Sequence, residues 1–226
     1  KIRREFTANV SHELKTPLTT ISGYAQMISN GMAKTEDIKE FGRKIEKESD
    51  RLLTLIDDII NLSNIDEQGS IENPENIDLS LVTEEAICVL EKAAKERGIQ
   101  IYYTKIPTFI KGNVTLVSEL VYNLLDNAIK YNKDNGKITV FVGESAKGVE
   151  LSVKDTGIGI PPEDTERIFE RFYRVDKSHS KKVGGTGLGL SIVKHVCACH
   201  NATIRVKSKV GKGTTIYVTF PNNVNN

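Results

Sequence analysis

Apolar residues recur every seven positions in the first third of the chain, and a second apolar set lies between them. This heptad-like pattern predicts two long helices. Asn30-Gly31 is a helix stop and Thr35 begins a plausible helix start, so the turn of a helical hairpin is predicted near residues 30–36. The seam positions are Val10, Leu14, Pro17, Ile21, Tyr24 and Ile28 in the first helix and Ile38, Phe41, Ile45, Leu52, Leu55, Ile59 and Leu62 in the second.

Two such helices cannot bury their apolar stripes completely against one another. The simplest solution is a homodimer in which two hairpins form a four-helix bundle. The alternative is a monomeric hairpin that packs on the rest of the chain.

A polar stretch follows the hairpin, and Gly69, Ser70 and Pro74 break the periodicity there, as is typical of a linker. The final residues are predicted to be a disordered tail because they have nothing to bury. The boundaries are 1–66 for the helical domain, 67–76 for the linker, 77–222 for the second domain and 223–226 for the tail.

Helical and strand patterns alternate in the second domain. The strands are short and hairpin-like, which favours an α+β sandwich over a doubly wound parallel sheet. Helices are predicted over 80–97, 113–132 and 187–199, and strands over 99–104, 137–142, 149–154, 203–208 and 214–220.

The composition is that of a soluble globular protein, with 38% hydrophobic and 27% charged residues. Its net charge of +1 removes the electrostatic case for nucleic-acid binding or a polybasic membrane module. Three cysteines argue against a disulfide scaffold and indicate a reducing compartment. Because the chain begins without Met in a helical pattern, we expect it to be the soluble part of a longer protein.

His12 lies between the seam positions Val10 and Leu14, so it is predicted on the outer face of the hairpin, with Thr16 one turn along. Glu13 can hold the ring nitrogen that does not react, which leaves the other nitrogen a lone pair for attack. Pro17 removes one backbone hydrogen bond and should kink or loosen this helix. A surface histidine before a helix break would give the same local pattern.

Residues 123–131 read NLLDNAIKY, and their spacing puts Asn123, Asn127 and Lys130 on one helical stripe. A carboxamide oxygen suits Mg²⁺, which takes substrate phosphates as further ligands, and a lysine supplies a point charge for those phosphates. An ordinary exposed polar face would show the same stripe.

Asp155 begins DTGIGIP directly after a predicted strand, and an ionised carboxylate accepts hydrogen bonds from a donor such as the adenine amine. Residues 184–190 read GGTGLGL before a helix, so their amides can face phosphates as part of a lid. Arg174, in IFERFYR, could stabilise a departing phosphoryl group. The segment GKGT, which ends at Thr214, precedes the last strand.

Together these segments resemble the sensor histidine kinases of two-component systems. The stretch around His12 is similar to their phospho-acceptor box. The later motifs resemble, in order and spacing, the N, G1, F, G2 and G3 boxes of the GHKL-type (Bergerat) ATP-binding domain, which is shared with type II topoisomerases, Hsp90 chaperones and MutL proteins. The likeness covers nearly the whole chain.

The resemblance implies ATP-dependent autophosphorylation of His12, assisted by Glu13, and transfer to an aspartate of a response regulator receiver domain. It gives Thr16 the role of aligning a water that dephosphorylates the regulator, and it implies a cytoplasmic kinase portion anchored to a membrane through a segment outside this chain. By resemblance Asn127 binds Mg²⁺ and Asp155 the adenine. The other expected nucleotide contacts are Asn123, Lys130, Tyr131, Gly157, Gly159, Gly185, Thr186, Gly187, Leu188, Gly189 and Thr214.

Two other functions stay open. A GHKL ATPase uses a Glu as general base where this chain has Asn123, which cannot accept a proton at neutral pH. A catalytically silent dimeric scaffold is the other alternative. The chain departs from the family pattern at residues 195–202, HVCACHNA, where Asn201 is expected to keep the left-handed turn and Cys197 and Cys199 to pack rather than bind metal.

Overall fold

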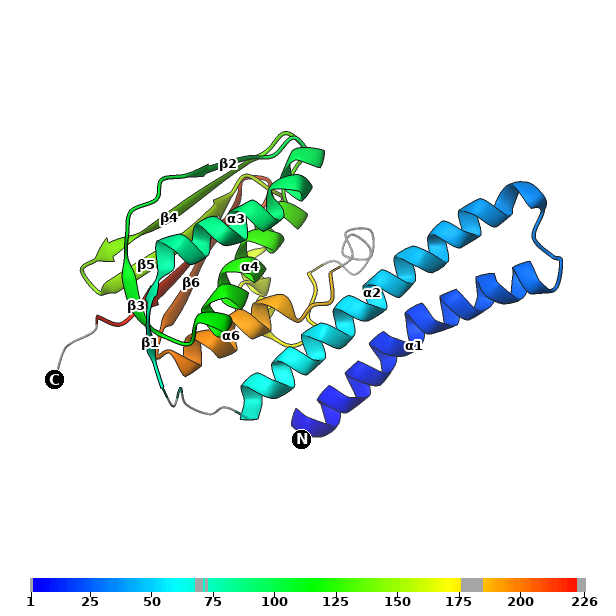
Figure 1. Cartoon of the computed structure of the whole chain (residues 1–226), viewed down its shortest axis with the longest axis horizontal. Helices are drawn as coiled ribbons and strands as arrows, with labels where there is room; N and C mark the ends of the chain where they lie inside the picture. The colour runs from blue at the N-terminus through cyan, green and yellow to red at the C-terminus, as the bar shows by residue number, and fades with distance from the viewer. Residues whose placement is uncertain (1, 68–70, 72, 176–184, 223–226) are drawn as a thin grey trace. The chain divides into compact units, whose positions relative to one another are not determined.

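The computed structural model describes residues 2–67, 71, 73–175 and 185–222. They form two compact units: the N-terminal helices, with Gly185 and Thr186, make up the first, and the sheet with the remaining helices makes up the second (Figure 1). The tail predicted at 223–226 lies outside the described residues. No helix in the described ranges is both long and apolar enough to cross a bilayer.

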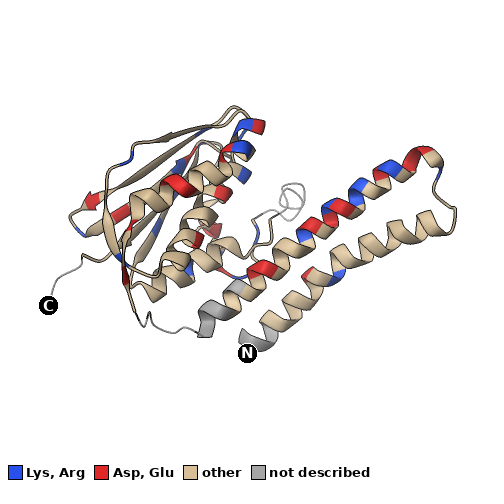
Figure 2. Ribbon diagram, viewed as in Figure 1, with Lys and Arg blue, Asp and Glu red and all other residues tan. Residues whose placement is uncertain are grey.

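The first unit is the predicted helical hairpin, formed by α1 (Ile2–Ser29) and α2 (Thr35–Glu67). Gly31 adopts a positive φ of 66° in the connection, and the Met32 amide donates to the Met27 carbonyl. The rings of Tyr24 and Phe41 lie 4.9 Å apart between centroids, so these two predicted seam positions do meet across the hairpin. Charged residues are far more frequent along α2 than along α1 (Figure 2).

Pro17 does not interrupt α1, which remains one continuous helix. The proline still has no amide to donate one turn back. Neighbouring hydroxyls bond to backbone carbonyls on this stretch: Thr16 Oγ1 donates to the His12 carbonyl at 3.2 Å and Thr20 Oγ1 to the Thr16 carbonyl at 3.2 Å. Such hydroxyl bonds can compete with the helical ladder, yet α1 continues through His12 and Pro17 as one α-helix.

The second unit is a two-layer sandwich. Its mixed five-stranded sheet has the order β2-β4-β5-β7-β6, and the helices cover one face (Figure 1). The helices are α3 (Leu79–Glu96), α4 (Val114–Lys130) and α6 (Gly189–Cys199); the strands are β2 (Gln100–Tyr103), β4 (Lys137–Ser145), β5 (Gly148–Asp155), β6 (Thr203–Lys209) and β7 (Gly213–Phe220).

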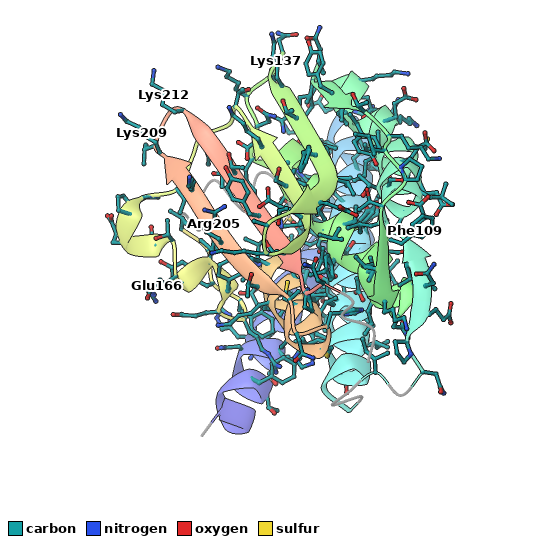
Figure 3. The ribbon with its side chains drawn as sticks, turned by 90° about the vertical axis from the view of Figure 1, so that its left-hand side faces the viewer. Phe109, Lys137, Glu166, Arg205, Lys209 and Lys212 are labelled. Atoms are coloured by element: carbon teal, nitrogen blue, oxygen red, sulfur yellow. The ribbon has the colours of Figure 1, made fainter. Side chains whose placement is uncertain are left out.

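Alternation along the strands builds the core. Ile138, Val140 and Val142 of β4 are buried, whereas Thr139 and Phe141 between them are exposed. The opposite face of the sheet carries polar and cationic residues, among them Arg205, while Lys209 and Lys212 lie at the β6–β7 turn (Figure 3). The helices therefore cover only one face of the sheet. The candidate site lies where the ends of these helices meet the ends of the strands.

Every helix and strand predicted in the second domain is present, with small shifts at the ends. Two strands were missed, β1 (Glu75–Asp78) and β3 (Phe109–Gly112), which pair antiparallel in a separate small sheet. β2 is as short but reads QIYY, with residue types typical of strands, whereas β1 reads ENID and shows no such enrichment. β1 also begins inside the predicted linker. The β2–β4 pair is parallel, so the sheet is not built from hairpins alone.

Candidate functional site

The imidazole of His12 is exposed on α1, as predicted, with 81% of its side-chain surface accessible. Its Nδ1 lies 3.9 Å from Glu13 Oε1, which is ion-pair distance rather than a hydrogen bond. Glu13 is more buried, and its Oε2 lies 3.8 Å from Nη2 of Arg51 on α2. Glu13 thus lies on the Nδ1 side of the ring. Thr16, also exposed, shares this face one turn along.

The stripe of Asn123, Asn127 and Lys130 lies on α4, next to the N-terminus of α6. A Cβ added to Gly189 would stand 2.6 Å from Asn123 Oδ1 and 3.5 Å from Asn127 Nδ2, so only glycine lets α6 approach these carboxamides. Lys130 Nζ lies 2.7 Å from Asp126 Oδ2. The structure therefore brings Gly189 next to two asparagines that precede it by more than sixty positions in the chain.

Asp155 is the last residue of β5 and is half-buried. Its Oδ1 accepts from the Gly157 amide at 2.7 Å and from the Thr214 amide at 3.2 Å. Burial raises the pKa of this carboxyl above its ordinary value, and the amide hydrogen bonds oppose that shift. Two fixed donors on one oxygen orient the group, so the other oxygen can serve a ligand.

Glycines let the backbone close in around Asp155. A Cβ on Gly157 would lie 2.1 Å from the Tyr131 carbonyl oxygen, so this glycine packs directly on the end of α4. Gly159 has a φ of 71° and a Cβ there would meet the Lys209 carbonyl at 2.2 Å. The predicted residues Tyr131, Gly157, Gly159, Asp155 and Thr214 thus form one cluster.

The segment before α6 is described from Gly185 onward. Gly187 has a φ of 77°, and its carbonyl accepts from the Phe172 amide at 2.8 Å, which joins the lid segment to the stretch that contains Arg174. Arg174 and Gly185 are half-buried, and Thr186 and Leu188 are buried. Leu188 is the N-cap of α6 and makes no side-chain cap hydrogen bond.

The unusual end of α6 keeps its turn, as predicted: Asn201 has a φ of 51°, and the Ala202 amide donates to the Cys197 carbonyl at 2.8 Å. Burial raises the pKa of the Cys197 thiol to about 12. Among the described residues, no group of three or more His, Cys, Asp or Glu side chains is placed to hold a metal ion.

Sequence reasoning assigned no role to His200, yet it joins two helices. Its Nδ1 lies 2.9 Å from the Val196 carbonyl and its Nε2 accepts from the Asn113 amide at 3.2 Å, so the ring is neutral with its proton on Nδ1. Burial lowers the pKa of His200 below its ordinary value. Nothing in the local sequence signals that a backbone amide 87 positions away is its donor.

This histidine predicts a pH dependence of stability. An unfolded His200 binds a proton more readily than the folded one, so the free energy of unfolding should fall as the pH drops below about 6.5 and should not depend on this group above that value. Thermal melts of the wild type and His200→Gln between pH 8 and 5.5 measure the effect. The variant should be less stable than the wild type at pH 8 but should lose less stability on acidification. If the stability of both proteins changes equally with pH, the assignment to His200 is contradicted.

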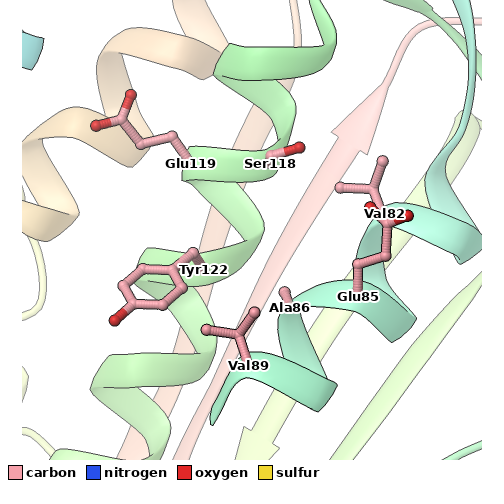
Figure 4. A pocket seen from close by; sticks show the side chains of 7 residues that line it. All are labelled: Val82, Glu85, Ala86, Val89, Ser118, Glu119 and Tyr122. Atoms are coloured by element: carbon pink, nitrogen blue, oxygen red, sulfur yellow. The ribbon is translucent and has the colours of Figure 1, made fainter.

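A shallow pocket opens elsewhere, between α3 and α4 (Figure 4). Val82 and Val89 of α3 face Tyr122 of α4 across it. None of the predicted nucleotide contacts lines this pocket. It is therefore separate from the Asp155 cluster.

Two family models match the chain. Residues 2–68 match the His Kinase A (phospho-acceptor) domain, and residues 112–224 match the histidine kinase-, DNA gyrase B-, and HSP90-like ATPase. These ranges contain the exposed His12 and the Asp155 cluster respectively. The chain belongs to the two-component sensor histidine kinases.

Comparisons with individual proteins support this family assignment. Over 221 residues the chain is 38% identical to the sensor-like histidine kinase SenX3 of Mycobacterium tuberculosis, which covers 97% of this chain and 54% of SenX3. The chain thus spans about half the length of this curated relative. The structure of full-length ShkA in complex with AMPPNP matches with a TM-score of 0.67 and 27% identity, over 96% of this chain and 45% of ShkA.

The histidine kinase ThkA in complex with the response regulator TrrA matches with a TM-score of 0.75 over 97% of this chain and 61% of ThkA. At 24% identity this likeness shows the shared fold. The predicted fold class, a helical hairpin followed by an α/β sandwich of the GHKL type, is confirmed.

Proposed function

We propose that this chain is the kinase portion of a sensor protein and transfers the terminal phosphoryl group of ATP to His12. One observation carries the proposal: the half-buried carboxylate of Asp155 is oriented by two amides inside a glycine-lined cluster, in a chain whose hairpin displays an exposed imidazole. ATP is the proposed substrate because an oriented acceptor matches the adenine amine.

In the proposed reaction, the neutral imidazole attacks the terminal phosphorus with Nε2, because Glu13 lies on the Nδ1 side. An N–P bond forms, the bond from phosphorus to the bridging oxygen breaks, and ADP leaves with the electron pair. The ring proton at Nδ1 can then pass to Glu13. Positioning and electrostatics supply most of the rate enhancement in phosphoryl transfer. The residues of the nucleotide site must therefore hold the phosphates in place and stabilise their charge.

The α4–α6 contact fits the phosphates and a magnesium ion. Because Gly189 has no side chain, the N-terminus of α6 lies close to the carboxamides of Asn123 and Asn127, and Asn127 would offer its oxygen as a metal ligand. Bound Mg²⁺ would neutralise charge on the phosphates. The N-terminus of α6, where Leu188 gives no side-chain cap, suits the same anionic groups. Lys130 and Arg174 would add positive charge.

We further propose that the hairpin forms a homodimer and receives a response regulator. Several large apolar side chains stay exposed on the hairpin, including Leu18 at 58%, Leu53 at 60% and Ile60 at 51%. A second copy would cover part of this surface in a four-helix bundle. The regulator's receiver aspartate is the proposed acceptor of the phosphoryl group from His12. We place this portion in the cytoplasm, in a protein with a membrane anchor outside this chain.

Labelling the purified chain tests the kinase proposal. Incubation with Mg²⁺ and ATP that carries a radioactive terminal phosphate should yield protein-bound label that is lost in acid and retained in base. A GHKL ATPase would release phosphate without labelling the protein, and a silent scaffold would do neither.

Thr16 is predicted to serve phosphatase activity more than kinase activity. Its hydroxyl lies on the His12 face and can orient a water, whereas autophosphorylation needs no water. Thr16→Ala should therefore slow dephosphorylation of the phosphorylated regulator by about a hundredfold, while self-labelling stays within a few-fold. Thr19→Ala, which removes another exposed hydroxyl from α1, is the matched control. Equal losses of both activities in Thr16→Ala would refute the assignment.

A further inference from the structure

We infer that Arg97 is a positioning residue for the nucleotide site, a role that rests on the ATP-binding function proposed above. Arg97 is the C-cap of α3 and lies far along the chain from every motif that suggested the site. Its guanidinium holds the end of α4 and the turn after it. That turn carries the backbone on which the Asp155 cluster is packed.

The guanidinium reaches backbone acceptors at the end of α4. Nη1 donates to the Ile129 carbonyl at 2.5 Å and the Lys130 carbonyl at 3.0 Å, and Nη2 donates to the Asn132 carbonyl at 2.7 Å. Nε donates to Asp134 Oδ1 at 3.0 Å. Ile129 and Lys130 are the last residues of α4, and the last carbonyls of a helix have no amide partners within the helix and carry the negative end of its dipole. The guanidinium therefore supplies these two carbonyls with both a donor and a positive charge.

The carbonyl contacts matter more than the ion pair with Asp134. Asp134 has 75% of its side chain exposed, and exposed ion pairs contribute little because water screens them. The three carbonyls instead need donors fixed in different directions. A planar guanidinium provides such a fork, whereas the single ammonium group of a lysine does not.

Hydrogen bonds connect this turn to the residues that follow Asp155. The Asn132 side chain is buried, and its Oδ1 accepts from the Thr156 hydroxyl at 3.2 Å. Thr156 directly follows Asp155, and its Oγ1 in turn accepts from the Lys137 amide at 2.9 Å. The Ile158 amide donates to the Tyr131 carbonyl at 3.1 Å.

Close packing also couples the turn after α4 to the loop after Asp155. A Cβ on Gly157 would lie 2.9 Å from Asn132 Cα as well as 2.1 Å from the Tyr131 carbonyl oxygen, so the loop after Asp155 rests on the turn that Arg97 holds. A shift of that turn must move Gly157, whose amide orients the Asp155 carboxylate. Loss of Arg97 should therefore weaken recognition of the adenine rather than the phosphates.

Nucleotide titration calorimetry of the purified chain, with ATP and with GTP, tests this role. Arg97→Met and Arg97→Lys should each bind ATP about tenfold more weakly, the size typical of lost supporting hydrogen bonds, and should discriminate less between ATP and GTP. Lys95→Met removes an exposed cation near the same helix end and is the matched control. It should keep the wild-type affinity for ATP and the wild-type discrimination between ATP and GTP. Asp134→Asn should also bind like the wild type.

The following outcomes decide the inference. Wild-type affinity and discrimination in Arg97→Met would overturn it, and so would full rescue by Arg97→Lys. If Arg97→Met does not fold, Thr156→Val tests the other end of the hydrogen-bond chain, where loss of ATP-over-GTP discrimination supports the role and unchanged discrimination overturns it. A wild-type chain that binds no ATP would instead refute the proposed function.

Discussion

The variant His12→Gln should take up no acid-labile phosphoryl label from Mg·ATP, a loss of at least a thousandfold against the wild type. Glutamine is close to histidine in size and polarity, and His12 is exposed, so the helix should be preserved. The carboxamide nitrogen has no lone pair available for attack, and the proposed N–P bond cannot form. Quantifying label after denaturing electrophoresis, before and after acid treatment, measures the effect.

ATP binding separates loss of the acceptor from loss of the fold. His12 belongs to the helical unit and the Asp155 cluster to the other, so His12→Gln should bind ATP with wild-type affinity. The matched control is Gln26→Ala, which alters another exposed residue of α1. Acid-labile label that persists in His12→Gln would show that another residue accepts the phosphoryl group.

Replacing Asp155 with Asn should weaken ATP binding by a hundredfold or more. The carboxamide oxygen can still accept from the Gly157 and Thr214 amides, so the NH₂ group would face the ligand. Two hydrogen-bond donors, this NH₂ group and the adenine amine, would then face one another without an acceptor between them. Hydrogen bonds to charged groups contribute about 1.5–3 kcal/mol, and an unmatched donor adds its own desolvation cost.

The same substitution should not destabilise the protein. Burial raises the pKa of Asp155, which means that the folded state disfavours its charge, and a neutral isostere removes that cost. Titration calorimetry with ATP and a thermal melt separate the two effects. Glu144→Gln, an exposed carboxylate on β4, is the control. ATP binding by Asp155→Asn within threefold of the wild type would remove Asp155 from the adenine site.

Acidification should mimic this variant. Because the pKa of Asp155 is raised, its carboxyl gains a proton at a higher pH than an exposed aspartate does, and the adenine amine then loses its acceptor. The affinity of the wild type for ATP should accordingly fall as the pH is lowered towards that pKa, whereas the residual affinity of Asp155→Asn should show no such fall from this group.

The sequence alone determined the helical hairpin, the exposure of His12 and most of the sandwich, because each depends on local periodicity. Heptad spacing places His12 off the seam, and two-residue alternation identifies strands such as β4. It also located the glycine-rich segments and Asp155, since each is a short run of unusual residues. Their nucleotide contacts and the domain boundaries remain predictions.

Only the tertiary structure showed how the site is supported. Three acceptors of Arg97 are backbone carbonyls 32 to 35 positions away. His200 and Asp155 in turn accept hydrogen bonds from the distant backbone amides of Asn113 and Thr214. Every residue has the same amide and carbonyl, so no pattern of residue types reveals such a bond. Pairing across long separations, including the parallel β2–β4 register, is decided when the chain packs, because only then do those groups meet.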